Sequence, residues 1–362
     1  MDFFIKNISL FVVLMIVITF TFSILINSIL LKFSQNLGVR QKETNGEIRW
    51  NPSIKPSMGG ISFFVVFLIT FIVLSFINNS QPIAFDHLKI IGVFVVCTIA
   101  FIMGLADDAY NTQPLLKFVT QLICGLVLYF TGTKIMVFTT EAFNFSLTLL
   151  WVVGLMNSIN MLDNMDGITT TVSIVILFFI ILLNLNLNTI VTPLPILCLG
   201  VIGSLLGFLV YNWHPSKMFM GDTGSQFLGC FLAVLGVDYC WNSFSLVSNH
   251  SWYAINPILM GFSIVSLVFI LPLTDTITVS INRIIKGQSP FIGGKDHTTH
   301  HLFFKGLTEK RIAILFLTIG LISISLALIQ ILNYQLHWLI FSIIFCAITF
   351  VSLYLNTIIK RK

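Results

Sequence analysis

Two adjacent carboxylates stand at the end of a long apolar run, in the segment GLADDAYN. Neighbouring residues of a helix point about 100° apart, so one of Asp107 and Asp108 can face a cation while the other acts as a base. A solvated loop in which one aspartate caps the next helix explains this segment equally well. The pair is therefore a candidate site that needs support from other segments.

A second group of polar side chains ends another apolar run, in the segment NSINMLDNMDG. Asn157, Asn160 and Asp163 recur every three positions and wind slowly round one side of a helix, which suits a polar ligand better than lipid. Asp166 and Gly167 complete the segment. Packing poorly explains five amides or carboxylates within ten positions, so we interpret them as binding residues.

The segments YNWHP and FMGDTGS form a third group. The glycines on either side of Asp222 let the backbone approach a ligand closely, and Asp222 itself could cap the next helix or hold a hard cation. Capping explains Asp222 alone, but it does not explain the glycines together with Asn212 and Phe219. We therefore predict a ligand site here as well.

Histidines and lysines supply candidate anion-binding groups. In the segment DHTTHH, His297, His300 and His301 share one face if the segment is helical. They could hold zinc, but no HExxH motif or cysteine partner accompanies them and basic residues flank the run, so we favour an anion-binding surface for phosphates. In the segment KPSMGG, Lys55 could equally meet a phosphate or lipid headgroups.

The elements that must position these residues are membrane helices. Of the 362 residues, 56% are hydrophobic and 9% are charged, against roughly 25% charged in a soluble domain, and the mean hydropathy is +0.97. A membrane span needs roughly 20 apolar residues. Eleven uncharged runs approach that length, so we predict an all-α polytopic integral membrane protein with one transmembrane catalytic domain over residues 1–362. The runs cover residues 8–31, 58–78, 88–105, 114–131, 144–160, 169–187, 192–211, 225–241, 257–280, 312–332 and 335–357.

The distribution of charge predicts the orientation. With the N-terminus outside, all but Lys6, Lys89 and Lys134 of the 19 basic residues fall on one side, and positive charge marks the cytoplasmic side. We therefore predict an N-out, C-in topology, and the net charge of +5 needs no nucleic-acid partner. Seven acidic residues fall at the same face, which places the active site there. They are Asp107, Asp108, Asp163, Asp166, Asp222, Asp275 and Asp296.

These groups together indicate phosphoryl transfer. Carboxylate and amide oxygens select a hard divalent ion such as Mg²⁺, which typically bridges substrate phosphates. Basic and histidine side chains add recognition of anions, and phosphoryl transfer needs both kinds of group. The membrane setting implies that one substrate is a lipid.

The order and spacing of the segments resemble the polyprenyl-phosphate N-acetylhexosamine-1-phosphate transferases of glycosyltransferase family 4. This superfamily includes the enzymes that initiate enterobacterial antigen and teichoic acid, and the peptidoglycan enzyme that makes lipid I. KPSMGG, GLADDAYN, NSINMLDNMDG, FMGDTGS and DHTTHH occur in family order, from about Lys55 to His301. The lipid I enzymes carry three consecutive histidines, so DHTTHH is more similar to the initiating enzymes. Asn164 stands where many relatives have glycine, which leaves a modified aminosugar open beside N-acetylglucosamine.

The resemblance implies a reaction, its partners and its place in the cell. The donor would be a uridine diphosphate (UDP) N-acetylhexosamine, with UMP released, and the acceptor undecaprenyl phosphate, with Mg²⁺ as cofactor and Mn²⁺ as a possible substitute. The product would initiate a cell-envelope polysaccharide such as a cell-wall polymer or the O-antigen of lipopolysaccharide. The protein would be a homodimer in the bacterial inner membrane, in contact with the lipid bilayer.

The resemblance also implies roles for single residues. Asp222 would be the main metal ligand, with Asp108 and Asn160 as further metal contacts, and Asp107 would deprotonate or orient the lipid phosphate. Asp163 would act near the diphosphate. The catalytic set is Asp107, Asp108, Asp163 and His297. The substrate-binding set is Lys55, Asn157, Asn160, Asp166, Gly167, Asn212, Phe219, His300 and His301.

Two alternatives stay open on the sequence. The lipid phosphate could attack the donor's β-phosphorus directly, or an aspartyl-phosphate could form first. A different class of function, an ion-coupled transporter or lipid flippase, would show carboxylates near the membrane midplane and repeated halves with broken helices. Here most carboxylates fall at one face, and no repeat is visible in the sequence.

Overall fold

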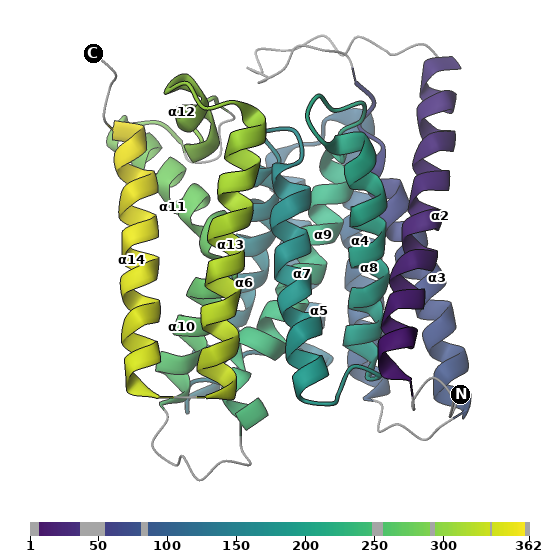
Figure 1. Cartoon of the computed structure of the whole chain (residues 1–362), viewed down its shortest axis with the longest axis horizontal. Coiled ribbons are helices and arrows are strands. Elements are labelled where there is room, and N and C mark those ends of the chain that lie inside the picture. Colours follow the sequence, from purple (N-terminus) through teal and green to yellow (C-terminus); the bar gives the residue numbers. More distant parts are fainter. Residues whose placement is uncertain are drawn as a thin grey trace.

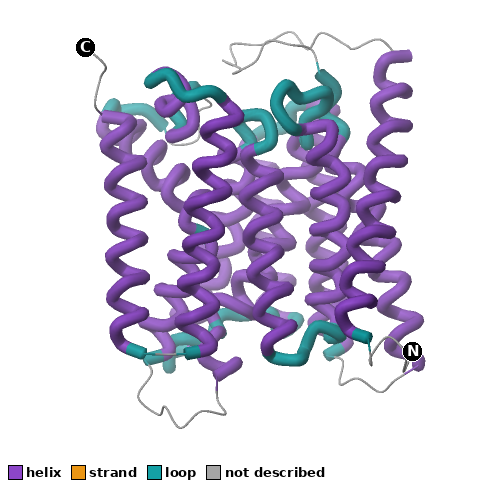
Figure 2. Tube along the Cα trace, viewed as in Figure 1, coloured by secondary structure: helices purple, strands orange, loops and turns teal. Residues whose placement is uncertain are grey.

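The computed structural model describes residues 7–36, 55–80, 86–247, 256–289, 294–333 and 335–358. Regular structure within these ranges is helical (Figure 2), apart from an isolated bridge between Ser57 and Phe219, so the all-α prediction is confirmed for them. Several basic residues used to predict the orientation lie outside the described ranges. These are Lys6, Arg40, Lys42, Arg49, Lys360, Arg361 and Lys362.

Eight of the described helices are long and apolar enough to cross a membrane. They are α2 (Ile8–Asn36), α3 (Gly59–Ser80), α4 (His87–Tyr110), α6 (Glu141–Leu162), α7 (Ile168–Asn186), α8 (Pro193–Asn212), α13 (Glu309–Leu332) and α14 (Leu336–Ile358). The other predicted runs fall on the shorter α5 (Pro114–Phe130), on α9 (Gly221–Leu235) with the π-helix η1 (Gly236–Trp241), and on the pair α10 (Pro257–Val268) and α11 (Ile270–Ile285). The chain is thus a polytopic membrane protein by length and composition, while eleven crossings and the orientation stay predictions.

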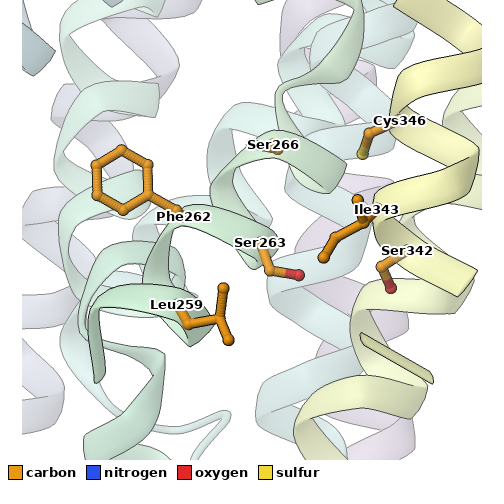
Figure 3. A pocket seen from close by; sticks show the side chains of 7 residues that line it. All are labelled: Leu259, Phe262, Ser263, Ser266, Ser342, Ile343 and Cys346. Carbon is orange, nitrogen blue, oxygen red and sulfur yellow. The ribbon is translucent and has the colours of Figure 1, made fainter. Parts of the chain in front are cut away.

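The pair α10 and α11 is bent by 87° at Phe269, as in a broken span or a re-entrant loop. Pro272 lies in the first turn of α11, where its missing N–H cannot bond the carbonyl of Val268, the last residue of α10. The break between the two helices therefore lies just before this proline. A pocket of about 210 Å³ lies between α10 and α14, and Ser263 and Ser342 are among the side chains that line it (Figure 3).

The described bundle brings polar segments together at one end. The C-terminal ends of α4, α6 and α8 and the N-terminal ends of α3, α7 and α9 all lie at the upper end of the bundle in Figure 1, as does the short helix α12 (Thr298–Phe304). The first described residues of α2 lie at the opposite end from the last of α14. These two ends of the described chain therefore lie on opposite faces.

Close helix contacts fix the start of α9, which is buried among α3, α4 and α6. A Cβ added at Gly60 of α3 would lie 2.1 Å from the Gly224 backbone nitrogen. A Cβ at Gly104 of α4 would lie 2.3 Å from the Asp222 carbonyl oxygen. Since real Cβ atoms essentially never approach backbone so closely, only glycine permits these contacts. They hold Asp222 against the ends of α3 and α4.

Candidate active site

An acidic centre with an embedded lysine lies where α4, α5 and α9 meet. Lys117 Nζ lies 2.6 Å from Asp107 Oδ2 and 3.4 Å from Asp222 Oδ1. The backbone N–H of Thr112 donates to Asp107 Oδ1 at 2.9 Å, and its hydroxyl donates to the same oxygen. Asp107 is buried, so its carboxylate is held by these two partners in a fixed orientation.

Lys117 is a site residue that sequence reasoning missed, because the lysine counted only toward the orientation. Its signal was present: a charged side chain in the first turn of the apolar helix α5. A charge at such a position usually persists for a function, and its partner is usually another charged residue.

Asp108 caps helix α9. Its carboxylate accepts from the backbone N–H groups of Asp222 (3.2 Å) and Thr223 (2.9 Å), and from the Thr223 hydroxyl (2.7 Å). Gly221 has φ 72°, and a Cβ there would lie 2.5 Å from Asp108 Oδ2. The predicted assisting and metal-binding role of Asp108 stays a prediction, whereas its capping role is visible in the structure.

Oxygen donors gather beside Asp222. The Ser225 hydroxyl donates to Asn160 Oδ1 at 3.1 Å, which joins the end of α6 to α9. Burial raises the pKa of Asp163 to about 8, and the charges of Asp222 and Asp108 act in the same direction. Carboxylates that repel each other in this way favour a bound proton or cation between them. The all-oxygen donor set fits a hard ion such as Mg²⁺.

Asn157 belongs to a hydrogen-bonded group of amides inside the bundle. Its Nδ2 donates to Gln121 Oε1 at 2.8 Å, and Gln121 Nε2 donates to Gln226 Oε1 at 3.1 Å. These bonds connect α5, α6 and α9 just below the acidic centre. Substrate contact by Asn157 is therefore still a prediction, and the structure shows a bracing role.

A second polar cluster surrounds Asp166. The backbone N–H and hydroxyl of Ser216 donate to its two oxygens at 2.9 and 2.7 Å, and Lys55 Nζ lies 3.6 Å from Oδ2. The Lys55 ammonium also donates to the Ser216 hydroxyl at 3.0 Å and lies 5.1 Å from the ring centroid of Phe219. An aromatic wall beside opposite charges can bind a planar, polar ring.

Asn212 fixes the loop that carries Asp166. Its Oδ1 accepts from the Gly167 N–H (3.1 Å) and from the Thr170 hydroxyl (2.7 Å), and its Nδ2 donates to the Met218 carbonyl (3.0 Å). Gly167 has φ 73°, which suits glycine at the start of α7. Both residues are buried, so they shape the cluster by holding its two loops together.

The histidine segment folds as the start of α12. His297 Nδ1 lies 2.8 Å from Oδ2 of the buried Asp275, whose Oδ1 accepts from the N–H and hydroxyl of Thr298. The ring centroids of His297 and His300 lie 5.3 Å apart, whereas the His301 ring packs beside Phe304. Within the described residues these three histidines do not converge as metal ligands, which goes against the zinc alternative.

The charge state of this segment refines its predicted role. Burial lowers the pKa of His300 to about 4, and nearby His297 acts in the same direction. Burial also lowers the pKa of His301, with Lys286 as the next cause. His300 is therefore neutral near pH 7, and it would meet an anion as a hydrogen-bond donor rather than as a cation.

The loop of residues 163–167 links the three groups. Asp163 lies at the acidic centre and Asp166 in the second cluster. Between them, Asn164 Oδ1 accepts from the Thr299 hydroxyl of α12 at 2.6 Å. The structure thus brings most of the predicted residues to one end of the bundle. The arrangement is an acidic centre whose oxygens could hold a metal ion, flanked by the Asp166 cluster on one side and by histidines on the other.

This chain belongs to glycosyl transferase family 4, whose sequence profile matches residues 90–239. A protein of Bacillus subtilis strain 168, named as a probable undecaprenyl-phosphate N-acetylglucosaminyl 1-phosphate transferase, is 30% identical over 93% of this chain and 90% of its own length. A phospho-N-acetylmuramoyl-pentapeptide-transferase of Staphylococcus epidermidis is 29% identical over 81% of this chain and 89% of its own. A decaprenyl-phosphate N-acetylglucosaminephosphotransferase of Mycobacterium tuberculosis is 26% identical over 65% of this chain and 62% of its own.

Proposed function

We propose that this protein transfers N-acetylglucosamine-1-phosphate from UDP-N-acetylglucosamine to undecaprenyl phosphate and releases UMP. The observation that carries the proposal is the acidic centre of Asp107, Lys117 and Asp222 at one end of a membrane bundle, beside the Asp166 cluster. The relatives' names support both the acceptor class and the sugar. The reaction takes place at the cytoplasmic face of the bacterial inner membrane, because UDP-sugars are made in the cytoplasm.

Asp222, Asn160 and Asp163 would hold the metal ion. Their oxygens match the ligands of Mg²⁺, and Mn²⁺ accepts the same set. When bound, the ion supplies positive charge that offsets the donor's diphosphate. Burial raises the pKa of Asp163 to about 8, and the charges of Asp222 and Asp108 add to the effect, so a cation at this place would favour the ionised form. Asp108, by capping α9, keeps Asp222 at this position.

Lys117 and Asp107 prepare the lipid phosphate. A phosphate monoester has a second pKa of about 6 and is largely dianionic at neutral pH, so it needs neutralisation and orientation more than deprotonation. Lys117 offers the charge, and Asp107 holds Lys117 in place. An oxygen of the lipid phosphate attacks the β-phosphorus, and the bond from this phosphorus to the bridging oxygen breaks. The electron pair leaves with UMP.

The Asp166 cluster binds the uridine end of the donor. Phe219 offers a face for stacking of the uracil, and Lys55 and Asp166 offer a charged donor and an acceptor beside it. His297 and His300, on the other side of the loop of residues 163–167, hydrogen-bond the diphosphate or the sugar. The neutral His300 suits this role because it can donate without adding charge.

Three further attributes follow from the same proposal. The product initiates a cell-envelope polysaccharide, such as a teichoic acid or another cell-wall polymer or an O-antigen. N-acetylglucosamine is the expected donor sugar, since the muramyl-pentapeptide relatives are matched over less of this chain. The protein works as a homodimer in the bilayer.

The test is release of UMP by the detergent-purified protein, supplied with UDP-N-acetylglucosamine, undecaprenyl phosphate and Mg²⁺. We expect release that depends on the lipid and is abolished by EDTA and by Asp222→Ala, while Asp86→Ala at the opposite end of α4 leaves it unchanged. Lipid-dependent release with another UDP-aminosugar alone would correct the donor. No UMP release with any donor would overturn the proposal and favour the hypothesis of an ion-coupled transporter. The bent pair α10 and α11 is the structural feature relevant to that hypothesis.

The one-step route has its own test. A rapid-quench experiment with radiolabelled donor and no lipid acceptor would look for a phosphosugar bound to the protein. We expect none, because the acceptor's own phosphate is the nucleophile. An adduct that forms and decays at the rate of turnover would instead establish the aspartyl-phosphate route.

A further inference from the structure

His214 bridges two carboxylates from distant parts of the chain. Its Nδ1 lies 3.3 Å from Asp166 Oδ2 and 3.0 Å from Oε2 of Glu309, the first residue of α13. The two carboxylates are nearly buried, with side-chain exposures of 4% and 11%, whereas His214 is 34% exposed. One imidazole nitrogen therefore lies within reach of both acids.

The same three side chains have the spacing of metal ligands, with all three ligand atoms within 4.8 Å of one another. The surroundings favour a hydrogen bond instead. Asp166 Oδ2 already accepts the backbone N–H of Ser216, and the Lys55 ammonium lies 3.6 Å away. A metal ion at this oxygen would meet both positive groups, while an imidazole N–H adds one more donor to an acceptor that attracts donors.

The bridge through His214 connects the Asp166 cluster to the long membrane helix α13. His214 belongs to the loop between α8 and α9, Asp166 to the loop between α6 and α7, and Glu309 to α13, which packs against α7. Asp166 is otherwise held by Ser216 and Lys55, which approach from the loops around it. His214 connects Asp166 to α13 through Glu309.

We propose that His214 is a positioning residue for donor binding, which holds Asp166 in its binding orientation by bridging it to Glu309. This inference rests on the proposed function, since it assumes that Asp166 meets the uridine end of the donor. In the described part of the chain, the polar contacts of His214 go to Asp166 and Glu309 and not to the acidic centre. Its loss weakens the uridine nucleotide's affinity and leaves the transfer step intact.

The experiment compares the full-length protein with His214→Ala, His214→Asn and, as a control, His337→Ala, an exposed histidine at the opposite end of the bundle. Binding of UMP is measured by calorimetry, and turnover by UMP release. For His214→Ala we expect roughly tenfold weaker UMP binding and a roughly tenfold higher KM for the UDP-sugar, as for one lost hydrogen bond to a charged group. The kcat and the KM for undecaprenyl phosphate stay within about twofold. Asparagine places an N–H where Nδ1 lies, so His214→Asn restores most of the affinity.

Glu309→Ala completes a cycle. We expect it to weaken UMP binding when His214 is present and to have no further effect in the His214→Ala protein, because the two act through one bridge. UMP binding by His214→Ala equal to wild type would overturn the inference and leave the proposed function standing. So would a fall in kcat at unchanged KM, or a folded His214→Asn protein no better than His214→Ala. A wild-type protein that binds no uridine nucleotide would instead overturn the proposed function.

Discussion

Lys117 and Asp107 form a close ion pair, with 2.6 Å between Nζ and Oδ2, at the end of the bundle where the polar segments meet. The same ammonium reaches Asp222 at 3.4 Å, so the two acids that the proposed reaction needs most share a single cation. Removing this cation would leave two facing carboxylates without compensation. A buried charge that loses its partner is costly, and the cost falls directly on the site.

We therefore predict that Lys117→Met lowers kcat by at least about a hundredfold, because the cation that faces the lipid phosphate is lost. Lys117→Arg should retain part of the activity. The assay is lipid-dependent UMP release, and Lys134→Met, at the other end of the bundle, is the control. Wild-type kcat in Lys117→Met would show that the lysine only balances charge.

Helix contacts through glycine make a second prediction. Gly60→Ala would place a methyl group 2.1 Å from the Gly224 backbone, whereas Gly154 of α6 has no atom within 4 Å of the same group. Alanine is about 1 kcal/mol better than glycine within a helix. Gly154→Ala should therefore keep or raise the apparent Tm in detergent, and Gly60→Ala should lower it and abolish activity. Equal Tm values would mean that α3 can shift away from α9 at little cost.

The contact between Asn164 and Thr299 makes a third prediction. Because this hydrogen bond of 2.6 Å joins the loop of residues 163–167 to the histidine helix α12, the single changes Asn164→Ala and Thr299→Val should each lower kcat/KM for the donor. The double change should be little worse than either, with a coupling of about 1 kcal/mol. Steady-state kinetics of the four proteins measures this coupling. Fully additive losses would show that the two side chains act separately.

The pairing of Asp296 with Arg283 predicts a dependence on pH. Burial alone would raise the pKa of Asp296, but the two hydrogen bonds of 2.7 Å and the charge of Arg283 hold it below its usual range. A depressed carboxylate pKa stabilises the fold above the unfolded value of about 3.9, and this stabilisation is lost as the pH falls through the folded value. The apparent Tm of wild type should exceed that of Asp296→Asn at pH 6, and the difference should shrink below about pH 4. A difference that does not change with pH would assign the effect to packing.

Different parts of this protein were predictable to different degrees. The helices follow from apolar runs, and the meeting of Asp107 and Asp222 at one end of the bundle follows from their setting at the ends of such runs. Side-chain partners did not follow. Lys117 meets Asp107 where α4 and α5 pack together, and Ser216 and His214 meet Asp166 only once α7 and α8 have folded back on each other. Spacing along the chain says nothing of such contacts. Asn157 shows the converse, because an amide that the sequence predicts to face a ligand also forms a hydrogen bond with Gln121, which the sequence does not indicate.

The cap that Asp108 forms on α9 also affects how genetic data on this protein are to be interpreted. In a screen for inactive alleles, Asp107, Asp108 and Asp222 would score alike, yet an inactive Asp108 allele would report a displaced helix end. An isosteric Asp108→Asn allele keeps an oxygen that can accept from Thr223 and so separates shape from charge. Null phenotypes at neighbouring codons here would have unlike molecular causes, and a conserved acidic pair would not by itself mean two catalytic acids.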